Sequence, residues 1–88
     1  MLKGNQMLGI FLKKNREKLN ISQTELAKTL NIPPSYISQF ELDERVPNVK
    51  LLSQIVSILK INLKKTLFLA KETKLKRIKK RIERNYNS

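Results

Sequence analysis

The chain has 88 residues, and its 19 lysines and arginines outnumber 7 aspartates and glutamates to give a formal net charge of +12. This length allows one small domain, and the absence of cysteine and histidine removes the usual metal ligands, the thiol nucleophile and the commonest general base. We therefore expect no enzyme and no cofactor, and the excess of positive charge indicates a polyanionic partner, because cations that neutralise phosphates release condensed counterions.

The N-terminal segment predicts a soluble, cytoplasmic protein. The stretch "MLKGNQMLGIFLKKN" lacks the uninterrupted apolar region and the small-residue cleavage site of a secretory signal, and no apolar run reaches membrane-spanning length. Residues 1–6 show no periodicity and are expected to be a loose lead-in, with Met7 an alternative start. No membrane partner is expected.

A first helix is predicted over residues 7–19. Apolar residues at helical spacing define its inner face, namely Leu8, Phe11, Leu12 and Leu19. Asn20 follows at a point where a left-handed residue is needed, a conformation that asparagine tolerates well.

Two short helices are predicted next, over residues 22–30 and 34–41. Ser22 and Glu25 form an S-x-x-E capping box, Asn31 ends the first of these helices, and two prolines start the second. The residues expected to point inward are Leu26, Ala27, Leu30, Ile32, Ile37 and Phe40. Those expected on the open side are Gln23, Thr24, Lys28, Ser35, Tyr36, Ser38 and Gln39.

The C-terminal half predicts two more helices. Asn48 can cap a helix with a broad apolar face, made by Leu51, Leu52, Ile55, Val56 and Leu59. A last helix begins near Leu63 and can continue towards Asn85, because no proline or glycine interrupts it. We expect a domain over residues 7–70 and a basic amphipathic helix or tail over residues 71–88.

The two short helices have the spacing of a helix-turn-helix, in which a small residue such as Ala27 lets the helices cross closely. Residues 8–67 resemble the lambda-repressor-like, Cro/C1-type helix-turn-helix family, also called the XRE family. The resemblance lies in "ISQTELAKTLNI", "SYISQFE", "ERVPN" and "LLSQIVSILKINLKKTL". It implies an all-α fold, a compact bundle of about five helices whose third helix lies in the major groove of DNA while the second crosses the backbone. The basic C-terminal helical extension lies beyond the family core.

The resemblance also implies which residues read bases. Besides Pro34, the groove-facing positions are occupied by Ser35, Tyr36, Ser38 and Gln39. Gln39 can pair with adenine through both ends of its amide, and Tyr36 can contact either a thymine methyl or a phosphate. Some relatives have a glutamine where this chain has Pro34, so direct readout is expected to be sparse, with more left to DNA shape.

Further positions implied by the resemblance contact the DNA backbone, namely Gln23, Thr24, Lys28, Arg45, Asn48 and Lys50. For Gln23, Arg45 and Lys50 an ordinary solvated surface residue is the alternative. Arg16 and Glu41 match positions that form a buried structural salt bridge in some relatives.

The basic tail leaves three alternatives. Leu75, Ile78 and Ile82 follow helical spacing among lysines and arginines. The segment can pair with its twin across a dimer, bind phosphates as an additional arm, or stay a flexible tail that orders on DNA. We favour a dimer through the last helix with the tail beside the DNA backbone.

Together these features predict a sequence-specific DNA-binding transcriptional regulator, a repressor that binds double-stranded DNA at a palindromic operator as a homodimer and is nucleoid-associated when bound. Phage, plasmid, restriction-modification and antitoxin contexts all fit. The rival is a protein-interaction module that holds a protein partner through the last helix or the tail. A second rival is an RNA- or membrane-surface-binding protein driven by the basic tail.

Overall fold

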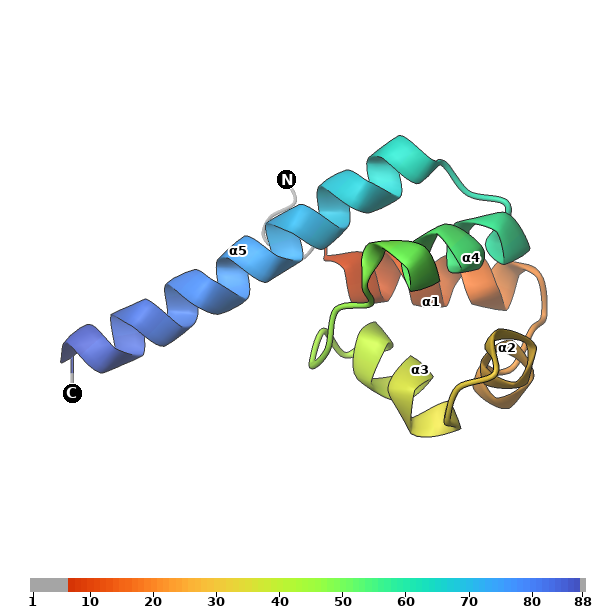
Figure 1. Cartoon of the computed structure of the whole chain (residues 1–88), viewed down its shortest axis with the longest axis horizontal. Helices are drawn as coiled ribbons and strands as arrows, with labels where there is room; N and C mark the ends of the chain where they lie inside the picture. The colour runs from red at the N-terminus through yellow and green to blue at the C-terminus, as the bar shows by residue number, and fades with distance from the viewer. Residues whose placement is uncertain (1–6, 88) are drawn as a thin grey trace.

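The computed structural model describes residues 7–87, with side chains to residue 84, and this part of the chain forms five helices and no strand (Figure 1). The all-α, five-helix fold expected from the sequence is therefore confirmed. In chain order the helices are α1 (Leu8–Lys18), α2 (Gln23–Leu30), α3 (Pro34–Glu41), α4 (Val49–Leu59) and α5 (Leu63–Asn87). The predicted lead-in over residues 1–6 lies outside the described residues.

The helix ends follow local chemistry. Ser22 Oγ accepts the Glu25 N–H at 3.0 Å, while the Glu25 carboxylate accepts the Ser22 N–H at 2.8 Å, which completes the predicted capping box. The same backbone hydrogen bond lowers the pKa of the Glu25 carboxyl. Asn20 and Asn31 both take the left-handed conformation expected of them, with φ of 57° and 59°. At α4, Asn48 Oδ1 accepts the Leu51 N–H at 2.8 Å.

One contiguous hydrophobic core joins all five helices. Ala27 has no exposed surface, as expected for a small residue where α2 and α3 cross, and Ile37 and Phe40 pack beside it. The other core residues are Leu8, Leu12, Leu26, Leu30, Leu52, Ile55, Leu59, Leu69 and Ala70. This core fixes α2 and α3 against α1 and α4.

The expectation that Leu19 lies inward is wrong. Its side chain is 41% exposed because α1 ends at Lys18, and Leu19 is the residue at which the chain leaves the helix. Leu8 and Leu12 carry the inner face instead, with Phe11 half-buried beside them.

Gly9 lies where α1 comes very close to the end of α3. A Cβ atom built on it would lie 2.3 Å from the backbone oxygen of Glu41 and 2.8 Å from that of Phe40. Since real Cβ atoms do not approach backbone so closely, only glycine lets α1 rest on the last turn of α3 at this point. No sequence pattern predicted this role of Gly9.

Helix α5 has two sections. Its first half packs on the globule through Thr66, Leu69, Ala70 and Thr73, which recur on one face, and the rest of the helix projects away without a break at residue 70 (Figure 1). On the opposite face lies what we call the outward stripe: Phe68, Leu75, Ile78 and Ile82, which are 48–60% exposed. No helix among residues 7–87 is long and apolar enough to cross a membrane.

Candidate nucleic-acid interface

The tight turn between α2 and α3 fixes how α3 is presented. Asn31 ends α2, and the Ile32 N–H donates to the Ala27 carbonyl at 3.0 Å, so the chain reverses within three residues. Pro33 and Pro34 then start α3. Pro34 and Ser35, the first residues of α3, are exposed to solvent, whereas Ser38 one turn later is half-buried.

Tyr36, Gln39 and Arg45 form a cluster at the surface of α3. Arg45 Nε donates to Gln39 Oε1 at 2.7 Å, and the guanidinium carbon lies 4.4 Å from the centre of the Tyr36 ring. Tyr36 is half-buried and meets Phe40 edge to face, with ring centres 6.3 Å apart. From the sequence, Tyr36 and Gln39 were expected on the open face of this helix and Arg45 in the following loop as a phosphate contact, and no interaction among the three was predicted.

A buried ion pair lies behind this surface. Arg16 donates through Nε to Glu41 Oε2 at 2.6 Å and through Nη2 to Oε1 at 3.0 Å. Its Nη1 donates to the Ile21 carbonyl at 2.7 Å. The hydrogen bond to Glu41 raises the pKa of Arg16 above its ordinary value, although burial opposes this shift. The pair joins α1, the start of α2 and the end of α3.

The expectation that Gln23 points outward is wrong. This side chain is half-buried, and its Nε2 donates to Glu41 Oε1 at 2.8 Å, so it extends the buried ion pair. The carboxylate of Glu41 attracts the amide because Arg16 alone leaves acceptor capacity on its oxygens.

The other residues predicted to contact the DNA backbone are exposed. Thr24 and Lys28 lie on α2, Arg45 follows α3, and Asn48 and Lys50 lie at the start of α4. Asn48 uses its side-chain oxygen to cap α4, so any contact it makes to a phosphate must come from its amide nitrogen. These residues therefore come from α2, from the loop after α3 and from the start of α4.

The loop after α3 is fastened to both α1 and α5. Asp43, with φ of 59°, accepts the Gly9 N–H on Oδ1 at 2.8 Å, and its carbonyl accepts a hydrogen bond from Arg77. Burial raises the pKa of the Asp43 carboxyl, and the Gly9 hydrogen bond opposes that shift. The loop that carries Arg45 is therefore positioned by groups from both ends of the chain.

Thr73 joins α5 directly to α1. It is almost fully buried, accepts the Leu8 N–H at 3.2 Å and donates to the Leu69 carbonyl at 2.8 Å. Thr73 was not predicted as a docking residue, although Thr66, Leu69, Ala70 and Thr73 are uncharged and share one helical face within a strongly charged segment. That face was a usable signal for where α5 docks.

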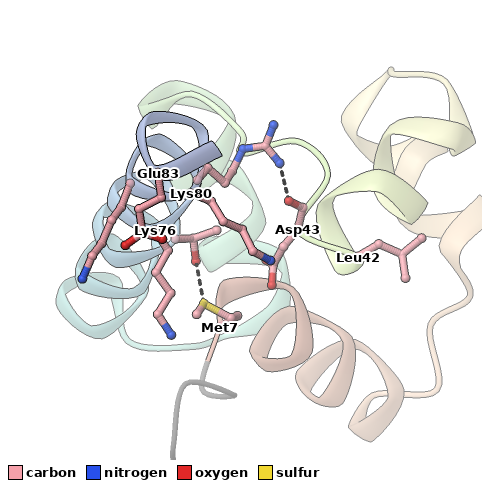
Figure 2. Close-up of a pocket in the computed structure, with 9 residues that line it drawn as sticks. Met7, Leu42, Asp43, Lys76, Lys80 and Glu83 are labelled. Carbon is pink, nitrogen blue, oxygen red and sulfur yellow. Dashed lines mark hydrogen bonds between the residues drawn. The ribbon is translucent and has the colours of Figure 1, made fainter. Parts of the chain in front are cut away.

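A cavity of about 650 Å³ opens between this loop and α5 (Figure 2). Its lining residues are Met7, Leu42, Asp43, Thr73, Lys76, Arg77, Lys79, Lys80 and Glu83. The cavity combines four cationic side chains with two carboxylates. No group of three or more histidine, cysteine, aspartate or glutamate residues that could hold a metal ion occurs among residues 7–87.

Comparisons with known proteins agree with this geometry. Residues 12–65 match the family model described as helix-turn-helix. A similar protein is the "ImmF control region 10 kDa protein" of Bacillus phage phi105, which is 35% identical over 63 residues, or 72% of this chain and 69% of that protein. No solved structure gives a significant match.

Proposed function

Since the chain belongs to the lambda-repressor-like (Cro/C1-type) helix-turn-helix family of DNA-binding regulators, we propose that it is a sequence-specific transcriptional repressor. In this proposal it binds a palindromic operator as a homodimer, with α3 in the major groove and α2 across the backbone. The observation that carries the proposal is the cluster of Tyr36, Gln39 and Arg45 at the outer surface of α3, in which Arg45 contacts both other side chains.

The base-reading residues in this proposal are Ser35, Tyr36, Ser38 and Gln39. The exposed residues around α3 contact phosphates, namely Thr24, Lys28, Arg45, Asn48 and Lys50. The side chain of Gln23 is bonded to Glu41, so in this proposal Gln23 acts on DNA binding by fixing the start of α2 against α3. The similarity to a phage control-region protein supports a role in a regulatory switch.

The outward stripe of α5 supports a dimer. Four large apolar side chains about half exposed on one face of a helix leave a surface that a second helix can cover. The lysines and arginines beside the stripe repel each other in such a pair, and nearby DNA phosphates reduce that repulsion.

The same stripe favours one rival function, an interaction module that holds a protein partner through α5. The two functions differ in sequence selectivity, since an interaction module binds DNA only through charge. Salt dependence alone does not separate them.

The first experiment selects bound sequences from a random duplex library at near-physiological salt and titrates the winner against scrambled DNA. We expect an enriched palindrome, bound by two chains about 10³-fold or more tightly than the scramble. Binding without an enriched sequence would refute operator reading and favour the interaction module.

Two variants then locate the contacts. Gln39→Ala should weaken binding to the selected site much more than to scrambled DNA, whereas Arg45→Ala should weaken both. Gln54→Ala, which removes an exposed glutamine of α4, is the matched control. Equal losses on both DNAs for Gln39→Ala would show that this residue does not read bases.

A further inference from the structure

The hydrogen bond between Gln39 and Arg45 limits which base Gln39 can read. An amide that pairs with adenine through two bonds must donate to N7 and accept from the N6 amino group. Here the only acceptor of that amide, Oε1, already receives the Arg45 Nε at 2.7 Å. This inference rests on the proposed function, and it concerns the base that α3 selects.

The Arg45 guanidinium is held in place from three directions. It lies 4.4 Å from the centre of the Tyr36 ring and bonds to Gln39. The backbone beside it is tied to α3, because the Glu44 N–H donates to the Gln39 carbonyl at 2.8 Å. The donor that occupies Gln39 is thus an exposed side chain that these contacts hold against the protein surface.

A carbonyl oxygen has a second lone pair, but that lone pair does not restore adenine reading. A second donor at Oε1 would lie beside the guanidinium, and a charged hydrogen bond is roughly twice as strong as a neutral one. The adenine amino group would therefore compete with Arg45 for the same atom. Gln39 is left with the two N–H groups of Nε2.

We propose that Gln39 and Arg45 act as one donor-only reading unit that selects guanine instead of adenine. Guanine offers two acceptors in the major groove, N7 and O6, which suit the two N–H groups of the Gln39 amide. The other N–H groups of Arg45 serve its proposed phosphate contact. Thymine offers one acceptor, and adenine adds a donor that would face other donors. Tyr36 serves this unit by supporting the guanidinium.

The test repeats the library selection with four proteins: the unmodified chain, Gln39→Ala, Arg45→Ala and Lys50→Ala. The position read by Gln39 is the one at which Gln39→Ala loses base preference. There the unmodified chain should prefer guanine by about tenfold, and Arg45→Ala should shift the preference towards adenine because Oε1 is released. Lys50→Ala removes a neighbouring positive charge that does not contact Gln39, so it should lower affinity for all sequences and keep the guanine.

Preference of the unmodified chain for adenine or thymine at that position would overturn the inference. The same holds if Arg45→Ala and Lys50→Ala select the same base. A library without any enriched sequence would instead refute operator reading itself, so the two failures are distinguishable.

Discussion

Replacing Arg16 with methionine is the sharpest test of how the interface is held. Methionine keeps an unbranched chain of similar length but removes both hydrogen bonds to Glu41 and the one to the Ile21 carbonyl. The Glu41 carboxylate is then buried without its cation, and the Gln23 amide still donates a hydrogen bond to it. Breaking a buried pair in this way costs about 3–5 kcal/mol.

That loss is large for a domain of this size. A chain of 88 residues has a free energy of unfolding of about 4–13 kcal/mol. At about 4–8 °C per kcal/mol, the Tm should fall by more than about 10 °C. Urea and thermal unfolding followed by circular dichroism measure both quantities.

Two further variants test whether the ion pair causes this loss of stability. Lys18→Met removes an exposed cation from the same helix and should change the free energy of unfolding by less than about 0.5 kcal/mol. The double variant Arg16→Met/Glu41→Leu removes both charges and should recover most of the lost stability. A loss below about 1 kcal/mol for Arg16→Met, or no recovery in the double variant, would show that the ion pair is not what holds these helices.

Three other predictions concern the contacts that position the loop and α5. Gly9→Ala should lower the free energy of unfolding by about 1–3 kcal/mol, because its Cβ would meet the Glu41 backbone oxygen at 2.3 Å. The urea midpoint should fall accordingly, and an unchanged midpoint would refute that close contact. Thr73→Val leaves the buried Leu8 N–H without its acceptor and should cost about 1–3 kcal/mol with faster hydrogen exchange at that amide, whereas Thr73→Ser should preserve both. Folding raises the pKa of the Asp43 carboxyl above its ordinary value of 3.8. The contribution of this group to folding stability is therefore complete below pH 3.8 and is lost as the pH rises through the folded-state pKa. Asp43→Asn should therefore raise the Tm at pH 7, with the gain shrinking towards pH 3, and a gain independent of pH would exclude the carboxyl as its source.

The helix-turn-helix could be predicted from the sequence because its signals are local. The capping box at Ser22, the left-handed Asn31 and the paired prolines each act within a few residues of where they stand. Helical spacing then separates the inner face of α3, with Ile37 and Phe40, from its outer face. Such features need no knowledge of the rest of the chain.

The contacts that were missed join distant parts of the chain. Leu8 and Thr73 are 65 positions apart, and Gly9 and Asp43 are 34 apart. No periodic pattern encodes which loop a helix will rest on. Gln39 and Arg45 are only six positions apart, but the path of the loop after α3 decides whether they meet, and helical spacing does not predict that path. The pairing changes the base that Gln39 is proposed to read.

Helix α5 is one continuous helix of 25 residues and is therefore about 37 Å long. Its docked face and its outward stripe lie on opposite sides of the helix, and their relative orientation is fixed because the helix is unbroken. A single residue inserted between Arg77 and Ile78 would rotate Ile78 and Ile82 by about 100° relative to Leu75, while seven inserted residues would nearly restore the alignment and add about 10 Å of reach. In a homodimer, the length of α5 would then set the distance between the two recognition helices, and insertions in this helix would change the operator spacing that the protein accepts.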